Sequence, residues 1–410
     1  MIARITMSSV PRLRPNLISR RFIDYKPEHY QWMLEEAPLC RGRVAVIPCW
    51  LISRHADCLQ LTTDKRFVRN RATATGGRRV PIPMPKSVAL LAQGMIVEDD
   101  PEHRRLRSLV QKAFTPTAMR KLEGRVETIT TELLDSLDGT GPFDLTRDWS
   151  LPIPVRMISE MLGVSADEMP QLRDGLRVLS SGLSGWALFR TFFLDLPRTA
   201  VFLRGMIARK RADPGDDILT ALIHAEEDGE CLSEDELVAM VFLLIIAGYE
   251  TTVHLLSNSV LTLLEHPEAL EQLQQEPGLI GSAVEELLRF CGPIHGTKPQ
   301  FAISDFEMHG HVIPRGSAVF PVLGAANIDP RVFDNPLQFD IQRQPNHHLA
   351  FGHGPHICLG AALARMEARI ALPALFARFP NLRLAVPREE LRLQRLPLWH
   401  RYETMPVRLS

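Results

Sequence analysis

The sequence predicts a mainly α-helical protein with small β-sheets, folded as a single domain over residues 1–410. Three observations support this prediction. Residues 233–264 form one long apolar helical stretch, and the chain is helical for most of its length between residues 101 and 293. Two shorter regions, 44–68 and 294–322, alternate like strands between glycine and proline turns. We therefore expect a helical body with minor sheets.

Composition and charge fit a soluble globular protein. The 47 basic and 48 acidic side chains leave a formal net charge of -1, which offers no basic field for nucleic acid. None of the six cysteines forms a Cys-x-x-Cys pair, so we expect free thiols in a reducing, cytoplasmic compartment. No signal peptide is evident, and the longest uncharged apolar run, 237–249, is shorter than the roughly 20 residues of a membrane anchor.

The first elements are a small sheet and an irregular segment. Residues 44–68 mix β-branched residues with polar breaks, which predicts strands with a helix between them. Residues 72–95 contain three prolines, and we expect no regular helix there. Pro101 suits the first turn of the next helix, and the two aspartates before it favour the positive end of that helix.

The clearest single element is the long helix. Ser233 and Glu236 form a capping-box pattern at its start, and the helical pattern runs to about Leu264. At 1.5 Å per residue this helix is about 48 Å long, and its apolar residues on nearly all sides predict that it is buried. Beyond it, residues 294–322 predict strands, residues 327–345 predict turns, and a last helix is expected after Cys358.

The long helix contains one anomaly at residues 247–252, Ala-Gly-Tyr-Glu-Thr-Thr. Glu250 is the only charged side chain between residues 237 and 264, and a buried carboxylate is costly unless it is paired or protonated. Gly248 costs about 1 kcal/mol relative to alanine, and the adjacent hydroxyls are able to bond back to helix carbonyls and open the helix locally. Two interpretations stay open: a kink satisfied by a distant arginine, or a groove where Glu250 and Thr251 deliver protons to a small ligand.

A second segment, residues 351–360, reads Phe-Gly-His-Gly-Pro-His-Ile-Cys-Leu-Gly. Its glycines permit backbone conformations closed to other residues and allow a flat ligand to approach closely. Cys358 precedes the predicted last helix, whose positive end would lower the pKa of the thiol. A shielded, hydrogen-bonded thiolate can serve as an axial metal ligand.

This segment has other interpretations. Cys358 is also compatible with a small buried hydrophobic residue. A dinucleotide loop is excluded, because the third glycine of G-x-G-x-x-G would fall at Ile357. A zinc cluster would need an unusual spacing and would draw its ligands from His347, His348, His353, His356 and Cys358.

A third pair, Glu286 and Arg289, lies three residues apart on a predicted helix and can form an ion pair, although E-x-x-R alone is common by chance. Taken together and in this order, the three segments resemble the cytochrome P450 family of heme-thiolate monooxygenases, in its soluble bacterial form. Residues 351–360 fit the family motif F-G-x-G-x-H-x-C-x-G at every fixed position, and residues 247–252 match the oxygen-binding stretch. The resemblance implies the cytochrome P450 fold, with a long central helix crossing over the heme.

The resemblance also implies heme b as cofactor, O2 as co-substrate and a role for each matching residue. Cys358 would be the proximal ligand of the iron, and Glu250 and Thr251 would relay protons during the reduction of O2. The remaining residues would surround the cofactor or hold the fold: Phe351, Gly352 and Gly360 beside the sulfur, Ala247 and Gly248 leaving room over the iron, His103, Arg107 and His356 on the propionates, and Glu286, Arg289 and Arg343 as a buried structural cluster.

One position departs from the family pattern. Counted back from Asp305 and Glu307, the family usually places an arginine at position 300 as a propionate partner, whereas this chain has Gln300. A neutral amide can donate a hydrogen bond but brings no charge. Lys298, two residues earlier on the predicted strand, would face the same side and is expected to compensate.

The substrate and the partners follow only in outline. Segments near residues 72–95 and 176–203 roof the pocket in this family, and the central helix lines it. Their apolar side chains indicate a small apolar organic substrate, such as a terpenoid, fatty acyl or polyketide-like molecule, although core packing explains about half of the roof residues equally well. The pocket residues expected from this comparison are Met84, Leu90, Leu91, Phe189, Leu244 and Ala247.

Electrons would come from a separate ferredoxin or flavodoxin with an NAD(P)H-dependent reductase, because the chain shows no flavin or iron–sulfur module. We expect the surface cations to steer an acidic carrier toward the cysteine side of the heme. They are Arg104, Arg105, Lys112, Arg365 and Arg369. The alternatives are a peroxide-dependent peroxygenase, against which the Glu250–Thr251 pair argues, and a heme-binding sensor or carrier without turnover.

Overall fold

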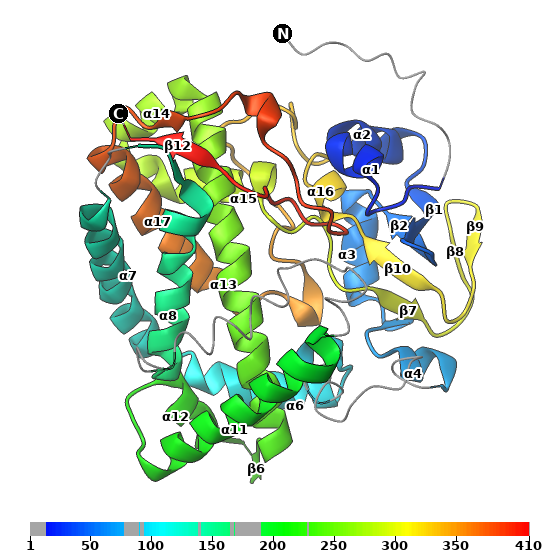
Figure 1. Cartoon of the computed structure of the whole chain (residues 1–410). Helices are drawn as coiled ribbons and strands as arrows, with labels where there is room; N and C mark the ends of the chain where they lie inside the picture. The colour runs from blue at the N-terminus through cyan, green and yellow to red at the C-terminus, as the bar shows by residue number, and fades with distance from the viewer. Residues whose placement is uncertain are drawn as a thin grey trace.

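The computed structural model describes residues 14–77, 90, 94–137, 141–164, 168, 190–227 and 229–409. Helices dominate this part of the chain, as predicted, and Figure 1 shows most of them gathered on one side of the molecule with the largest sheet on the other. The α-helices are α1 (Arg20–Asp24), α2 (Lys26–Glu35), α3 (His55–Thr63), α4 (Arg71–Thr75), α6 (Glu102–Ala113), α7 (Pro116–Ser136), α8 (Pro152–Leu162), α11 (Leu196–Ala212), α12 (Ile218–Ile223), α13 (Glu234–Glu265), α14 (Pro267–Gln275), α15 (Ile280–Cys291), α16 (Leu323–Ala326) and α17 (Ala361–Arg378).

The predicted central helix is α13, and its boundaries follow from local chemistry. The Ser233 hydroxyl accepts a hydrogen bond from the backbone of Glu236, and the Glu236 carboxylate accepts one from the backbone of Ser233. The helix ends at Glu265, one residue later than predicted, before His266 and a proline. Most of its side chains are buried, because α8, α15 and α17 pack around it.

By length and composition α13 could also cross a membrane, and it is the one such helix in the described part of the chain. The 13-residue run 237–249 is therefore only a section of a longer apolar helix. In the fold, 67% of the most apolar window of α13 is buried inside the protein. This burial is typical of the core helix of a soluble protein.

The two regions predicted to contain strands join in one five-stranded sheet with the order β1-β2-β10-β7-β3. β1 (Leu39–Val44) and β2 (Ile47–Ile52) form an antiparallel hairpin, and β10 (Ala318–Pro321) adds to β2 in parallel. β7 (Gln300–Ala302) then pairs antiparallel with both β10 and β3 (Phe67–Val68). A short β-hairpin of β8 (Phe306–Met308) and β9 (His311–Ile313) projects beyond this sheet (Figure 1).

Smaller elements depart from the predicted pattern. Residues 71–75 form the short helix α4, because the Asn70 side chain caps it and Gly76, with φ of +67°, ends it. Within the largely helical middle, β5 (Glu226–Glu227) and β6 (Glu230–Cys231) form a hairpin. β4 (Phe143–Asp144) joins β11 (Arg383–Leu384) and β12 (Pro406–Arg408) near the C-terminus.

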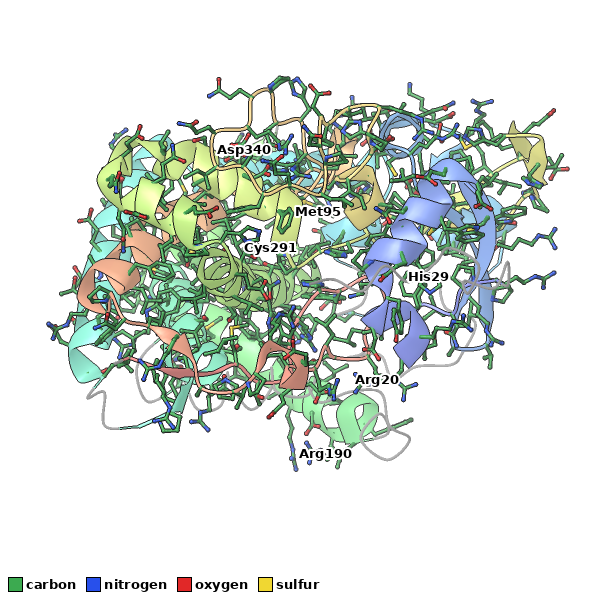
Figure 2. The ribbon with its side chains drawn as sticks, turned by 90° about the horizontal axis from the view of Figure 1, so that it is seen from above. Arg20, His29, Met95, Arg190, Cys291 and Asp340 are labelled. Carbon is green, nitrogen blue, oxygen red and sulfur yellow. The ribbon has the colours of Figure 1, made fainter. Side chains whose placement is uncertain are left out.

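The core is divided between the two sides of the molecule. Two apolar clusters lie among the helices, around α13, and two smaller ones lie around the sheet and α2. In Figure 2, seen from above, Cys291 at the end of α15 lies among the helices and His29 marks α2. All six cysteines are free, as expected from their spacing.

Candidate active site

The site begins on an accessible stripe of α13. Ala247 is exposed and Leu244 and Thr251 are partly exposed, whereas Ile245 and Glu250 are buried. Residues three and four apart share one face of a helix, so these three side chains form a continuous strip. Because the rest of the helix is mostly buried, this exposure indicates a space beside the strip. The space is lined by the aliphatic side chain of Leu244, the methyl group of Ala247 and the hydroxyl of Thr251.

Gly248 has a packing role that the sequence did not predict. A Cβ added at this glycine would lie 2.8 Å from Cδ1 of Ile158 on α8. The glycine therefore lets α8 and α13 approach closely. This contact does not test the prediction that Gly248 leaves room over a cofactor. Ala247 is the more exposed of the two residues.

The threonines at this point bond back to the helix, as predicted. The Thr251 hydroxyl donates to the Ala247 carbonyl at 2.7 Å, and the Thr252 hydroxyl donates to the Gly248 carbonyl at 3.2 Å. The helix nevertheless stays continuous from residue 234 to residue 265, so the expected local opening is absent. The Thr251 oxygen keeps lone pairs that can accept a hydrogen bond from the accessible side.

Glu250 is buried and forms an ion pair with Arg401, 151 residues further along the chain. This is the distant arginine that one of our two interpretations required. Arg401 is itself buried, and its Nε has no hydrogen-bond partner. One turn along α13, burial lowers the pKa of His254 to about 3, with Arg401 adding to the shift. The ion pair explains how the carboxylate is tolerated and leaves Thr251, its neighbour, open to the site.

The segment 351–360 forms a tight loop before α17. Gly352 and Gly354 have φ values of +72° and +73°, in the left-handed region that favours glycine, and a Cβ on Gly354 would lie 2.6 Å from the Thr62 carbonyl. The Cys358 amide donates to the Phe351 carbonyl at 2.9 Å, which closes the loop. Cys358 is exposed, so the loop presents a thiol to an accessible space.

The expected lowering of the Cys358 pKa is wrong for the free thiol. Burial by the surrounding protein raises this pKa, and the amide of Gly360 with the charges of Arg107 and Arg365 only partly opposes it. A group that is exposed and yet desolvated lies in a recess of the protein. Coordination to a metal cation deprotonates a thiol outright, which the helix end does not do here.

Phe351 lies beside this loop under a fixed cation. The Arg365 guanidinium lies 4.5 Å from the centre of the Phe351 ring and donates two hydrogen bonds of 2.7 Å to Glu285. His348 donates to the same carboxylate, and although burial acts in the opposite direction, these partners lower the pKa of Glu285 to about 2. The sequence alone did not reveal this cluster, because its members come from three separate segments.

A group of basic side chains gathers beside the loop. The rings of His103 and His356 are 4.0 Å apart, and burial lowers the pKa of His356 to about 3, with Arg69, His103 and Arg107 adding to the shift. Burial also lowers the pKa of Lys298, as does its neighbour Arg69. His103 Nε2 is buried without a partner. We name Arg69, His103, Arg107, Lys298 and His356 the cationic cluster after its arginines and its lysine, because the lowered pKa values keep the two histidines neutral near pH 7. A bound anion would relieve the repulsion among the cations and accept hydrogen bonds from the imidazoles.

The expected structural cluster is present, with Glu286 and Arg289 buried and Arg343 half-buried. Arg289 donates two hydrogen bonds of 2.7 Å to the Glu286 carboxylate, and Arg343 donates to it at 3.2 Å. Asn346 and the amide of Asp340 also donate to Glu286, at 3.1 Å each. These bonds tie α15 to the turn-rich segment that precedes the cysteine loop.

The structure describes some of the residues expected to line a substrate pocket and not others. Leu90 and Leu244 pack, half-buried, against the apolar cluster that contains α13. Met84, Leu91 and Phe189 lie outside the described residues. Of the residues expected in the pocket, the structure therefore describes Leu90, Leu244 and Ala247.

The surface cations expected to steer an electron carrier are engaged with acceptors. Arg104 pairs with Asp100 at 2.7 Å, and Arg365 is held by Glu285. Arg105 pairs with Glu102 and Glu236, Lys112 donates to the Glu226 carbonyl and Arg369 lies 3.9 Å from Glu285. These pairs reduce the positive field that we expected at this surface.

Three buried residues of the site were missed in the sequence. Arg69 and Arg401 belong to other segments than the groups they face, and only the fold brings them together. Glu367 on α17 is buried and hydrogen-bonds with Thr252, and burial raises its pKa to about 8. A charged residue inside an apolar helical pattern, as Glu367 is, was the one available signal.

The donor set fits a flat, anionic, iron-containing cofactor. The accessible Cys358 sulfur offers a soft metal ligand, the glycines allow close approach, and the cationic cluster with its unpartnered His103 nitrogen suits carboxylates. Zinc fits less well, because the described residues hold no group of three His, Cys, Asp or Glu side chains that could bind a metal ion. Fold and site together define a heme-binding oxidoreductase.

Comparison with known proteins identifies the family. The family model described as Cytochrome P450 matches residues 206–390. The Polyketide biosynthesis cytochrome P450 PksS of Bacillus subtilis is 38% identical over 92% of this chain and 94% of its own, and its solved structure superposes with a TM-score of 0.90 over 96% and 99% of the two chains.

Two further solved structures agree. Myxobacterial CYP267B1, in complex with myristic acid, is 35% identical with a TM-score of 0.89, covering 96% of this chain and 98% of that one. P450BioI, in complex with an acyl carrier protein carrying hexadec-9Z-enoic acid, is 33% identical with a TM-score of 0.86, covering 95% and 99%. The chain belongs to the cytochrome P450 family: it is a monooxygenase that uses heme b with O2 as co-substrate.

Proposed function

We propose that this monooxygenase inserts one oxygen atom from O2 into an apolar fatty acyl or polyketide-like substrate, with Cys358 as the ligand of the heme iron. The observation that carries the proposal is the accessible strip of Leu244, Ala247 and Thr251 on the buried helix α13. An aliphatic strip that ends in a hydroxyl suits a hydrocarbon chain held next to a proton donor. The names of the relatives above, which include a polyketide enzyme and complexes with myristic acid and an acyl chain, support the same class.

The loop residues would hold the cofactor. Cys358 would bind the iron, Phe351 under Arg365 would shield the sulfur, and Gly352 and Gly360 would let the loop and α17 lie close to the ring. His103, Arg107, His356 and Lys298 would receive its two carboxylates. Heme b, when bound, supplies the activation of O2 and the transfer of one oxygen atom to the substrate.

Protons would reach this chemistry through Thr251 and Glu250. The Thr251 hydroxyl is accessible and can pass a proton on while it accepts another, once its bond to the Ala247 carbonyl is exchanged. Glu250 directly precedes Thr251 in the chain and pairs with Arg401, so its carboxylate would accept a proton from water and pass it to this hydroxyl. Release of the carboxylate from Arg401 would accompany each transfer.

The electrons would come from a ferredoxin or flavodoxin in the cytoplasm, reduced from NAD(P)H. Arg104 and Arg365 are the cations offered for its docking, although both have acidic neighbours. Neutralising both side chains should slow reduction by roughly two- to fivefold at low salt and less at high salt. Equal rates at every ionic strength would exclude this docking surface.

A substrate screen tests the proposal. The heme-loaded chain would be titrated with saturated fatty acids, their thioesters and terpenoids, and displacement of the water on the iron would be followed as a shift of the Soret band. Hits would then be incubated with a surrogate ferredoxin, its reductase and NADPH. We expect oxygenated products from acyl compounds. Product formation only with hydrogen peroxide would favour a peroxygenase, and binding without any product would favour a sensor or carrier.

A further inference from the structure

Position 300 is a buried position in the sheet and carries no charge. Gln300 lies on β7 between β10 and β3, and it pairs with Val319 of β10. Its side chain is buried and its Oε1 has no hydrogen-bond partner. The arginine usual in the family at this position is missing, but the surroundings still include the cationic cluster.

The register of the sheet places another residue opposite Gln300. β3 and β7 are antiparallel, with Phe67 opposite Ala302 and Val68 opposite Phe301. β3 ends at Val68, and the same register continued by one step would place Arg69 opposite Gln300. Directly opposed residues of an antiparallel pair project from the same face, with Cβ atoms about 5 Å apart. A guanidinium on residue 69 can therefore reach the space that a longer side chain at position 300 would occupy.

Arg69 is fixed in this place from both ends. Its amide donates to the Asp99 carboxylate at 2.6 Å, and the amide of Asn70 donates to the other oxygen of Asp99 at 3.0 Å. Its Nη1 donates to the Thr297 hydroxyl at 3.2 Å and to the Lys298 carbonyl. The side chain therefore lies along residues 297–298, just before β7 begins.

The Arg69 guanidinium lies in a place where a cation is costly. The side chain is buried, its Nε has no partner, and burial lowers its pKa to about 10. It also helps to lower the pKa of Lys298, so its charge acts on another member of the cationic cluster. An anion between these side chains would use the free Nε donor and remove the repulsion.

We propose that Arg69 replaces the missing arginine of position 300 and binds a heme propionate from the neighbouring strand. This inference rests on the proposed function, since it requires that the chain binds heme. Lys298, which we expected to compensate, shares this role with Arg69. The two cations repel each other, and a propionate between them would stabilise both.

The test is the rate at which heme leaves the holoprotein for excess apomyoglobin, followed by absorbance without any turnover. Arg69→Gln should release heme roughly ten- to hundredfold faster than wild type, the range for loss of one hydrogen bond to a charged group. Arg66→Gln is the matched control, because Arg66 lies on the same segment but pairs with Asp64 at the surface. It should release heme at the wild-type rate.

Two further samples separate binding from folding. Adding Gln300→Arg to Arg69→Gln should restore at least part of the retention, because it returns the cation to the usual strand. Loading with heme dimethyl ester, which has no propionate charge, should abolish the difference between wild type and Arg69→Gln. A difference that persists with the ester, or an Arg69→Gln variant that behaves like Arg66→Gln, would overturn the inference while the proposed function stands. A wild-type chain that takes up no heme would overturn both.

Discussion

Two buried glutamates of this protein, Glu286 on α15 and Glu250 on α13, are each paired with arginine, and yet their surroundings differ. Glu286 accepts from two arginines, an asparagine and a backbone amide, which come from α15 and from residues 340–346. Glu250 pairs with Arg401 and adjoins Thr251, which is open to the site. A carboxylate enclosed by donors fixes a fold, whereas one held beside an accessible hydroxyl is available for chemistry.

The largest effect is expected at Glu286, the glutamate with the structural role. Glu286→Gln would leave Arg289 and Arg343 buried next to a neutral amide, so we expect the free energy of unfolding to fall by about 3–5 kcal/mol. Urea unfolding of the heme-loaded protein measures this change. Glu389→Gln, at an exposed position, is the control and should change it little. A Glu286→Gln variant as stable as the control would refute the structural role.

Glu250→Gln sharpens the comparison from the other side. The amide cannot relay a proton, so turnover driven by NADPH and O2 should fall roughly 100-fold, while binding of substrate, read from the Soret shift, stays unchanged. Retained turnover at the wild-type rate would show that Glu250 is only the partner of Arg401.

A pH dependence follows from the histidine next to this pair. His254 has a folded pKa of about 3, below the ordinary value near 6.5 of the unfolded chain, so protons bind the unfolded state first as the pH falls. The contribution of His254 to the free energy of unfolding is therefore fully present above pH 6.5 and is lost as the pH falls from 6.5 to 3. His254 alone accounts for about 2 kcal/mol at pH 5. His254→Gln should show a smaller loss of urea stability between pH 7 and pH 5 than wild type; an equal loss would contradict this assignment.

The smallest effect concerns packing at the same helix. Gly248→Ala would place a methyl group 2.8 Å from Ile158, and we expect a loss of about 1–2 kcal/mol in stability, partly recovered by Ile158→Val. Thermal unfolding of the two variants measures it. A Gly248→Ala variant that is as stable as wild type but binds substrate differently would instead show that Gly248 lines the substrate pocket.

The features that the sequence predicted well depend on residues that are close together in the chain. The capping box at Ser233 and the proline after His266 mark α13 to within one residue, and the Cys358 loop follows from its glycines and its motif. Pairings between distant segments were not predictable. Arg401 reaches Glu250 from 151 residues away, and Arg69 reaches Thr297 and Lys298 from a segment more than 220 residues earlier in the chain. The Cys358 pKa was predicted in the wrong direction, because a helix end is a local feature whereas desolvation depends on the whole fold.

The central claim is that the sulfur of Cys358 binds the heme iron. The most direct measurement is the visible spectrum of the reduced, carbon monoxide-treated protein, compared between wild type and Cys358→Ser after equal heme loading. The account predicts the red-shifted Soret band of a thiolate ligand in wild type and its loss in Cys358→Ser. An identical spectrum in both proteins, or a wild-type chain that stays colourless with heme supplied, would contradict it.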